Sequence, residues 1–223
     1  MKARHFQYVL AFGAAWMLAT AALAQERKPA AKGAAPPAAK PGEPSPEDMA
    51  KMMEAFQKAA TPGEHHAKLK PLAGKWSFVT KARMGPDQPW EESKGKAEYK
   101  WILGGRILVQ EVKAEPSPGD AMMGGAPFEG FGLTGYDNMT KEYWNVWGDN
   151  YGTGVMMSTG SADPSGKTFT YTGEYNDPMT GEAKTARSVL KIAGDDKLVF
   201  EMYDKGPDGK EYQMLEVTYT HQK

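Results

Sequence analysis

One stretch of the sequence decides the fold: Ala126-Pro-Phe-Glu-Gly-Phe-Gly-Leu-Thr-Gly-Tyr-Asp-Asn-Met-Thr-Lys-Glu-Tyr-Trp-Asn-Val-Trp-Gly-Asp149. It predicts two β-strands that fold back on each other at Asp137-Asn138-Met139-Thr140, because Asp and Asn side chains hydrogen-bond the nearby backbone in turns. The first strand contains three glycines, and the second contains three large aromatic residues, Tyr143, Trp144 and Trp147. Glycines inside a strand allow it to bend or let another group approach closely. The stretch therefore predicts a curved sheet that closes into a barrel.

Outward from this hairpin, most of the chain alternates apolar and polar residues in short segments separated by turn residues. With the two strands of the hairpin, the predicted strands number about ten, and the others lie within 74–80, 96–101, 106–112, 154–161, 167–175, 183–193, 198–203 and 211–221. No helical crossover separates neighbouring strands, so the sheet is expected to be antiparallel and up-and-down. Closure hides the sheet edges, which favours an all-β barrel. A two-sheet sandwich is the alternative, but its Greek-key links are longer than these.

The Gly104-Gly105 pair predicts a two-residue hairpin turn and thereby a register. In that register Trp101 faces Leu108, Tyr99 faces Gln110, and Leu103 faces Arg106. Directly opposed residues share a face. If the aromatic face points inward, Gln110 and Arg106 point inward too. An inward arginine requires a partner, so Arg106 is expected either to anchor an acidic ligand or to pair with a lumen carboxylate.

The N-terminus reads as a secretory signal peptide over residues 1–24. Lys2 and Arg4 precede an apolar run that is shorter than the roughly 20 residues a membrane helix needs, and Ala22-Leu23-Ala24 offers a cleavage site. An uncleaved anchor is the alternative. Cleavage removes two basic residues and changes the net charge from -1 to -3, which argues against a nucleic-acid partner. The chain contains no cysteine, so we expect a periplasmic or secreted bacterial protein without membrane attachment after cleavage.

Two further segments precede the predicted barrel. Residues 25–44 are rich in Lys, Ala and Pro and predict a disordered tether. Residues 45–63 predict an accessory helix in which Ser45 is the cap. Its stripe of Met49, Met52, Met53 and Phe56 is interpreted as an apolar face docked on the domain. Copper ligation by the methionines is the alternative. A second, shorter helix is expected from Thr61 to about Leu69.

Several motifs in this order resemble a known family. They include Leu69-x-x-Leu72-x-Gly74-x-Trp76, Gly104-Gly105-Arg106, Pro127-Phe128-Glu129-Gly130, Gly135-Tyr136-Asp137 and Asp177-Pro178-Met179-Thr180-Gly181. Together with the final hairpin they resemble the bacterial domain of unknown function 1579, over His65 to the C-terminus. The resemblance implies a calycin-like, lipocalin-like barrel over residues 64–223. It implies no catalytic residues.

Chemistry-bearing motifs are few. The chain has no Gly-x-Ser-x-Gly elbow and no phosphate-cradling glycine loop, so no catalytic set, cofactor or metal site is predicted. His65 and His66 are adjacent and point apart on a helix, which disfavours joint chelation. Barrels of the nitrobindin type resemble this architecture and bind haem through a late histidine, which makes His221 a haem-ligand candidate. The competing interpretation is a frayed, solvated histidine near the C-terminus.

The candidate ligand-binding residues are those expected to line the lumen: Trp76, Tyr99, Trp101, Arg106, Gln110, Tyr143, Asn145, Trp147 and Asp149. Such a mixture of aromatic and polar groups suits a pocket. Three functions stay open. The first is a non-enzymatic barrel that binds a small, partly apolar ligand. The second is an enzyme that uses polar lumen residues, and the third is a structural module whose interior is filled.

Overall fold

The computed structural model describes residues 44–177, 180–206 and 208–223. Residues 50–223 form one compact unit. The predicted signal peptide and nearly all of the predicted tether lie outside the described residues. Among the helices that the structure describes, none has the length and apolarity required to cross a membrane.

Helix α2 spans Pro46–Ala60, and its start follows the predicted capping chemistry. The Asp48 backbone N–H donates to the Ser45 hydroxyl at 3.1 Å, while the Ser45 N–H donates to the Asp48 carboxylate at 3.3 Å. These reciprocal bonds satisfy two donors that the first turn otherwise leaves unpaired. No residue of α2 is buried, and Met53 and Phe56 are each 53% exposed. The expectation that the Met/Phe stripe is docked on the domain is therefore wrong.

The C-terminal end of α2 is held by side chains from two hairpin turns. The Asn138 amide donates to the carbonyl oxygens of Ala59 at 3.0 Å and Thr61 at 2.8 Å. The Arg106 guanidinium donates to the Ala60 carbonyl at 2.7 Å. The last carbonyls of a helix have no partner within the helix, so these bonds fix the point at which α2 ends.

Replacing Asn138 by alanine should loosen the end of α2 without unfolding the barrel. The change removes the amide that binds these carbonyls, and we expect a local loss of about 1 kcal/mol. Amide hydrogen exchange should accelerate in residues 56–61, while the barrel's melting temperature stays constant. Asn176→Ala, at an exposed strand end, is the matched control. Unchanged exchange in α2 of the Asn138 variant would show that these bonds do not hold the helix.

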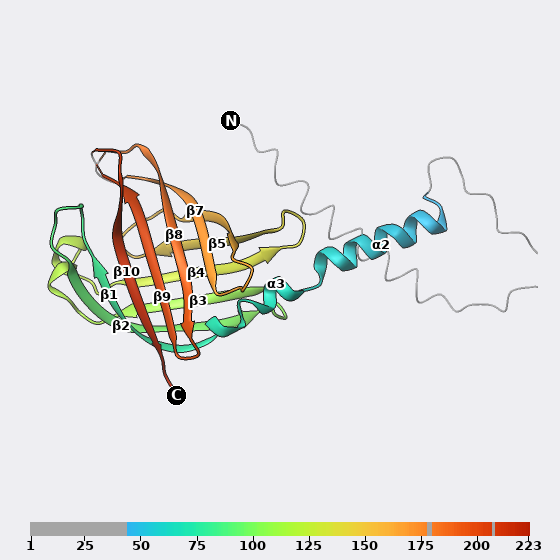
Figure 1. Cartoon of the computed structure of the whole chain (residues 1–223), viewed down its shortest axis with the longest axis horizontal. Helices are drawn as coiled ribbons and strands as arrows, with labels where there is room; N and C mark the ends of the chain where they lie inside the picture. The colour runs from blue at the N-terminus through green and yellow to red at the C-terminus, as the bar shows by residue number, and fades with distance from the viewer. Residues whose placement is uncertain (1–43, 178–179, 207) are drawn as a thin grey trace, which may run out of the picture. The chain divides into compact units, whose positions relative to one another are not determined.

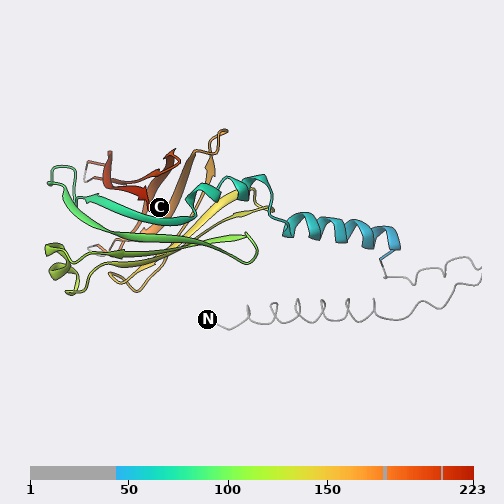
Figure 2. The ribbon, with the colours of Figure 1, turned by 90° about the horizontal axis from the view of Figure 1, so that it is seen from below.

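Ten antiparallel strands form the barrel, and each pairs with its neighbours along the chain. They are β1 (Gly74–Ala82), β2 (Glu91–Ile102), β3 (Ile107–Ala114), β4 (Glu129–Asp137), β5 (Glu142–Asp149), β6 (Met156–Ala162), β7 (Thr168–Asn176), β8 (Ala183–Gly194), β9 (Lys197–Lys205) and β10 (Glu211–His221). Pairing between β1 and β10 closes the ring. Figures 1 and 2 show the strands curving around a common interior. The predicted up-and-down barrel is confirmed.

The two ends of the barrel differ. One end carries the β2–β3, β4–β5, β6–β7 and β8–β9 turns together with helix α3 (Glu64–Ala67) and the 3-10 helix η1 (Lys70–Leu72); we call it the plugged end. The other end, the distal end, carries the remaining connections, including the 3-10 helix η2 (Pro118–Met123). The predicted helix from Thr61 to about Leu69 is shorter in the structure: α3 ends at Ala67, and the separate 3-10 helix η1 begins at Lys70.

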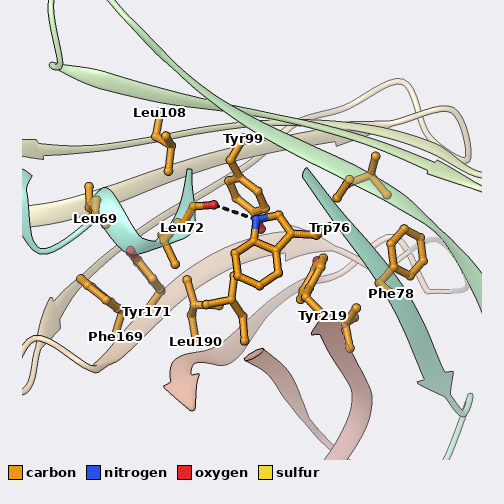
Figure 3. Packing of buried hydrophobic residues seen from close by; sticks show 14 of the residues in the cluster. Leu69, Leu72, Trp76, Phe78, Tyr99, Leu108, Phe169, Tyr171, Leu190 and Tyr219 are labelled. Carbon is orange, nitrogen blue, oxygen red and sulfur yellow. Dashed lines mark hydrogen bonds between the residues drawn. The ribbon is translucent and has the colours of Figure 1, made fainter. Parts of the chain in front are cut away.

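The core sits beneath α3 and η1. Leu69, Leu72 and Trp76 are at most 1% exposed, and the Trp76 indole N–H donates to the Leu72 carbonyl at 2.9 Å. Figure 3 shows this bond, with Leu108, Phe169, Tyr171 and Leu190 drawn as members of the same cluster. The hydrogen bond satisfies two polar groups that burial would otherwise leave unpaired. The Leu69-x-x-Leu72-x-Gly74-x-Trp76 motif thus ties η1 to the first strand.

The glycines of β4 make room for indole rings on both faces of the wall. Gly132 lies opposite Trp147, and Gly135 lies opposite Trp144. A Cβ atom at Gly132 would lie 3.1 Å from the Trp147 ring, and one at Gly135 would lie 2.4 Å from the Trp144 ring. The rings therefore cover bare backbone. The glycine-kinked strand beside an aromatic strand has the function that its sequence predicted.

The β2–β3 turn is longer than predicted. The strands end at Ile102 and restart at Ile107, and the turn includes a residue with positive φ, Leu103 at 49°. Trp101 nevertheless faces Leu108. The predicted pairs of Tyr99 with Gln110 and of Trp101 with Leu108 are confirmed, while the predicted two-residue loop and the pairing of Leu103 with Arg106 are wrong.

Candidate functional site

The pairing register shows which side chains face the barrel interior. Trp76 lies opposite Ala97, which in turn lies opposite Val112, and all three are buried. Towards the distal end, the inward-facing residues change from buried to half-buried, as at Met202 and Leu215. The wall is closed, so solvent reaches these residues through an end of the barrel.

The structure brings most of the predicted lumen residues to the inward face. Trp76, Tyr99, Gln110 and Tyr143 are buried, whereas Trp101, Asn145, Trp147 and Asp149 are half-buried and Arg106 is exposed. The buried members belong to the wall of the core, and the half-buried members lie closer to solvent. Their binding of a ligand stays a prediction.

A hydrogen-bonded group crosses the interior between β2, β3 and β10. The Gln110 amide donates to the Tyr219 hydroxyl at 3.3 Å, and the hydroxyls of Tyr99 and Tyr219 are also hydrogen-bonded to each other. Burial raises the pKa of both tyrosines. These residues stay protonated at neutral pH and form an uncharged polar belt.

Tyr171 supplies a second polar group, which the sequence did not single out. It lies on β7 opposite Ser188 of β8, and it is 4% exposed. Its hydroxyl is buried and has no hydrogen-bond partner in the described part of the chain, and burial raises its pKa. A buried hydroxyl without a partner destabilises the fold. Alternating polarity could place Tyr171 inward, but only the packed structure shows that its hydroxyl is unpaired.

Replacing Tyr171 by phenylalanine should stabilise the ligand-free protein. The change removes an unpaired buried hydroxyl and keeps the ring, so the free energy of unfolding should rise by about 1 kcal/mol. Tyr219→Phe is the matched control. It removes a hydroxyl that has two partners, so it should lower the free energy by a similar amount. Urea unfolding of both variants measures the difference, and a destabilised Tyr171 variant would show that its hydroxyl is paired in solution.

One side of the distal end is an aromatic and acidic cluster built from β5 and two loops. The Trp147 indole N–H donates to the Asp149 carboxylate at 2.9 Å. The Trp147 ring stacks on the Phe128 ring, with the ring centres 6.3 Å apart. The Tyr151 hydroxyl donates to Asp120 at 2.9 Å. Hydrogen bonds from Ser117 lower the pKa of Asp120. This cluster joins the β3–β4 and β5–β6 loops and presents an aromatic surface beside carboxylates.

The opposite side of the distal end repeats that chemistry. The Tyr175 hydroxyl donates to the buried Asp204 at 2.7 Å. Lys184 forms an ion pair with Asp177. Nearby, the Arg83 guanidinium lies 4.5 Å from the centre of the Trp90 ring. Lys184 and Arg83 are therefore both engaged by groups of the protein itself.

Arg106 does not take the predicted place in the lumen. Its side chain is exposed, and its guanidinium donates to the carbonyls of Leu103 and Ala60. The alternation that places Gln110 and Leu108 inward ends at Ile107, where the strand ends and the turn begins. The predicted ion pair with a lumen carboxylate is wrong, because Arg106 instead binds main-chain carbonyls at the plugged end.

A shallow pocket of about 240 Å³ lies beside Arg106. Its lining residues come from α2, α3, β3, β4, β5 and the β2–β3 and β4–β5 turns: Ala59, Ala60, His66, Arg106, Ile107, Tyr136, Asp137, Asn138 and Trp144. Trp144 thus lies on the outer face next to the helical segment. The pocket is widely open, and its polar groups already bind backbone.

The histidines have structural contacts. His65 stacks on Tyr136 with ring centres 4.3 Å apart. Burial lowers the pKa of His66, whose Nδ1 accepts the Gly63 N–H at 3.2 Å. His221 pairs with Trp76 across β1 and β10, so it is not frayed. A Cβ atom at Gly74 would lie 2.6 Å from the His221 Nε2, which leaves little room for a haem iron on that nitrogen in this conformation.

Among the described residues, several titratable groups of the barrel have pKa values shifted away from neutral pH. Burial raises the pKa of Tyr143 to about 12 and also raises that of Tyr175. Hydrogen bonds lower the pKa of Asp120. These shifts move away from neutral pH, whereas a general acid or base works best with a pKa near it. Within the described residues, no three His, Cys, Asp or Glu side chains lie close enough to hold a metal ion.

Comparison with known proteins agrees with the fold. A family model described as "Protein of unknown function (DUF1579)" matches residues 61–221, which confirms the resemblance read from the motifs. A crystal structure of Rv2717c from M. tuberculosis aligns at a TM-score of 0.53 and 14% identity, covering 73% of this chain and 100% of that one. A redesigned β-barrel aligns at a TM-score of 0.36 and 16% identity, covering 74% and 96%. The search of curated proteins finds no match.

Proposed function

We propose that this chain, which belongs to the DUF1579 family, binds a small, partly apolar molecule inside its barrel. The supporting observation is the inner wall near the distal end, where Trp147, Met202 and Leu215 face inward yet remain half-buried. A wall that is apolar, concave and reached by solvent is what a small-molecule site requires. The distal loops are the route of entry, because α3 and η1 cover the other end.

The uncharged probe N-phenyl-1-naphthylamine tests this proposal. Its fluorescence rises in apolar surroundings, so a titration of the full chain should saturate with one probe per barrel. Met202→Trp fills the same space from β9 and should weaken binding by about tenfold or more. Met157→Trp is the matched control, because Met157 lies on the outer wall and is 66% exposed.

The outcomes separate a binding barrel from a filled one. Saturable binding that Met202→Trp weakens and Met157→Trp leaves intact supports the proposal. If the full chain does not bind the probe, or if both variants bind alike, the interior is not the site. Leu215→Trp enters the same region from β10 and replaces Met202→Trp if circular dichroism shows that the latter does not fold.

A further inference from the structure

We infer that the barrel selects ligands whose buried polar group is uncharged, and that it excludes acids. This inference rests on the proposed function and adds the chemical class of the ligand. It is based on the distribution of charged residues along the inner wall, from the polar belt to the distal rim.

Between its two ends, the inner wall is uncharged. The buried or half-buried polar residues that the ten strands direct inward there include Tyr99, Gln110, Thr134, Asn145, Ser158, Tyr171, Ser188 and Tyr219. Each carries a hydroxyl or an amide, and on the strands none of the inward positions between the rims holds Lys, Arg, Asp or Glu. The Asn145 amide donates to the Thr134 hydroxyl at 2.9 Å. The wall offers hydrogen bonds but no counter-ion.

The charged groups that face inward are concentrated at the distal rim, where carboxylates predominate. Asp149 and Asp204 lie on the inward faces of β5 and β9, and Asp120 is buried in the adjoining loop. Two cations of this rim are engaged, since Lys184 pairs with Asp177 and Arg83 stacks on Trp90. A ligand that enters by this end passes several carboxylates.

Two features of the barrel therefore disfavour the binding of an anionic ligand. The rim carboxylates repel it during entry, and the wall gives its charge no partner once water has been removed. Burying an unpaired charge costs several kcal/mol, whereas a carbonyl, hydroxyl or amide can exchange water for the hydroxyls and amides of the belt. The apolar part of such a molecule fits the aromatic surface of Trp147 and Phe128.

Two dyes that share one scaffold test the inference on the full chain. N-phenyl-1-naphthylamine is neutral, and 8-anilino-1-naphthalenesulfonate adds only a sulfonate. We expect the neutral dye to bind at least about tenfold more tightly. Only anionic dye that the neutral dye displaces is counted, so adsorption on the outer surface does not enter the comparison.

Removing a rim carboxylate should reduce the difference in affinity between the neutral and the anionic dye. Asp204→Asn retains a side chain that can hydrogen-bond Tyr175, and it should strengthen binding of the sulfonate by about threefold or more while leaving the neutral dye unchanged. Glu174→Gln makes the same charge change on the exposed outer face of β7 and should have no effect. Asp149→Asn is the second variant if the first does not fold.

The results distinguish this inference from the proposed function. If the two dyes bind with equal affinity, the interior is a binding site and the inference is overturned. The inference is also overturned if Asp204→Asn and Glu174→Gln change the affinity for the sulfonate dye equally, or if neither changes it. In both cases the charge at the rim does not discriminate between the two dyes. If neither dye binds the full chain, the proposed function itself fails.

Discussion

Replacing Trp76 by alanine is expected to lower the free energy of unfolding by about 3–5 kcal/mol. Trp76 is fully buried, so the change opens a large cavity in the core beneath η1. It also leaves the Leu72 carbonyl without the indole donor. Natural domains are stable by only about 5–15 kcal/mol, so this single change should remove a large part of the total.

Trp90→Ala is the matched control for that experiment. Trp90 is 39% exposed and stacks on Arg83 near the distal end, so its loss should cost about 1 kcal/mol or less. The free energies of unfolding of both variants are measured by urea denaturation, with far-UV circular dichroism as the signal. If the two variants lose equal stability, the indole of Trp76 does not organise the core as the structure indicates.

Gly160→Ala should destabilise the barrel by about 3 kcal/mol, which is large for the addition of one methyl group. A Cβ atom at Gly160 would lie 1.9 Å from the Thr170 carbonyl oxygen, which belongs to the neighbouring strand β7. Because the obstacle is backbone and not the end of a flexible side chain, β6 and β7 must separate to admit the methyl group. Hydrogen exchange should accelerate in both strands.

A second strand glycine provides the contrast. The Cβ of Gly148→Ala, on β5, would meet nothing closer than the Val155 side chain at 3.4 Å. That variant should be neutral or slightly stabilising, because alanine restricts the unfolded chain. Equal losses of stability in the two variants would mean that the close approach at Gly160 is absent in solution.

The barrel could be predicted because its signals are local. Alternating polarity sets which side chains face inward, and short turns make neighbouring strands antiparallel. The pairing of Trp101 with Leu108 followed from the position of a single hairpin. Glycines beside Trp144 and Trp147 indicated curvature, and the structure shows the indoles lying over the bare backbone.

The errors occur where local rules stop. Strand alternation assigned Arg106 to the lumen, but the alternation holds only within the strand, and Arg106 lies in the turn that follows β2. The helical stripe of α2 predicted a docked face, because an apolar pattern gives no information about whether a partner is present. The interpretation of His221 as a frayed residue is wrong for the same reason, since the sequence does not show that Trp76 is its strand partner.

Other features of the site depend on contacts between distant residues. The amide of Asn138 binds the end of a helix about 80 positions earlier in the chain, and its sequence context indicates only a turn. The unpaired hydroxyl of Tyr171 is defined by what does not surround it. Such properties arise from packing, and periodicity carries no signal for them.

The central claim is that the barrel interior binds a small uncharged molecule, and native mass spectrometry of the intact protein tests it most directly. With N-phenyl-1-naphthylamine added in excess, the account predicts a complex of one probe per chain that Met202→Trp weakens and Met157→Trp preserves. A spectrum that shows only the bare chain at every probe concentration would contradict the claim.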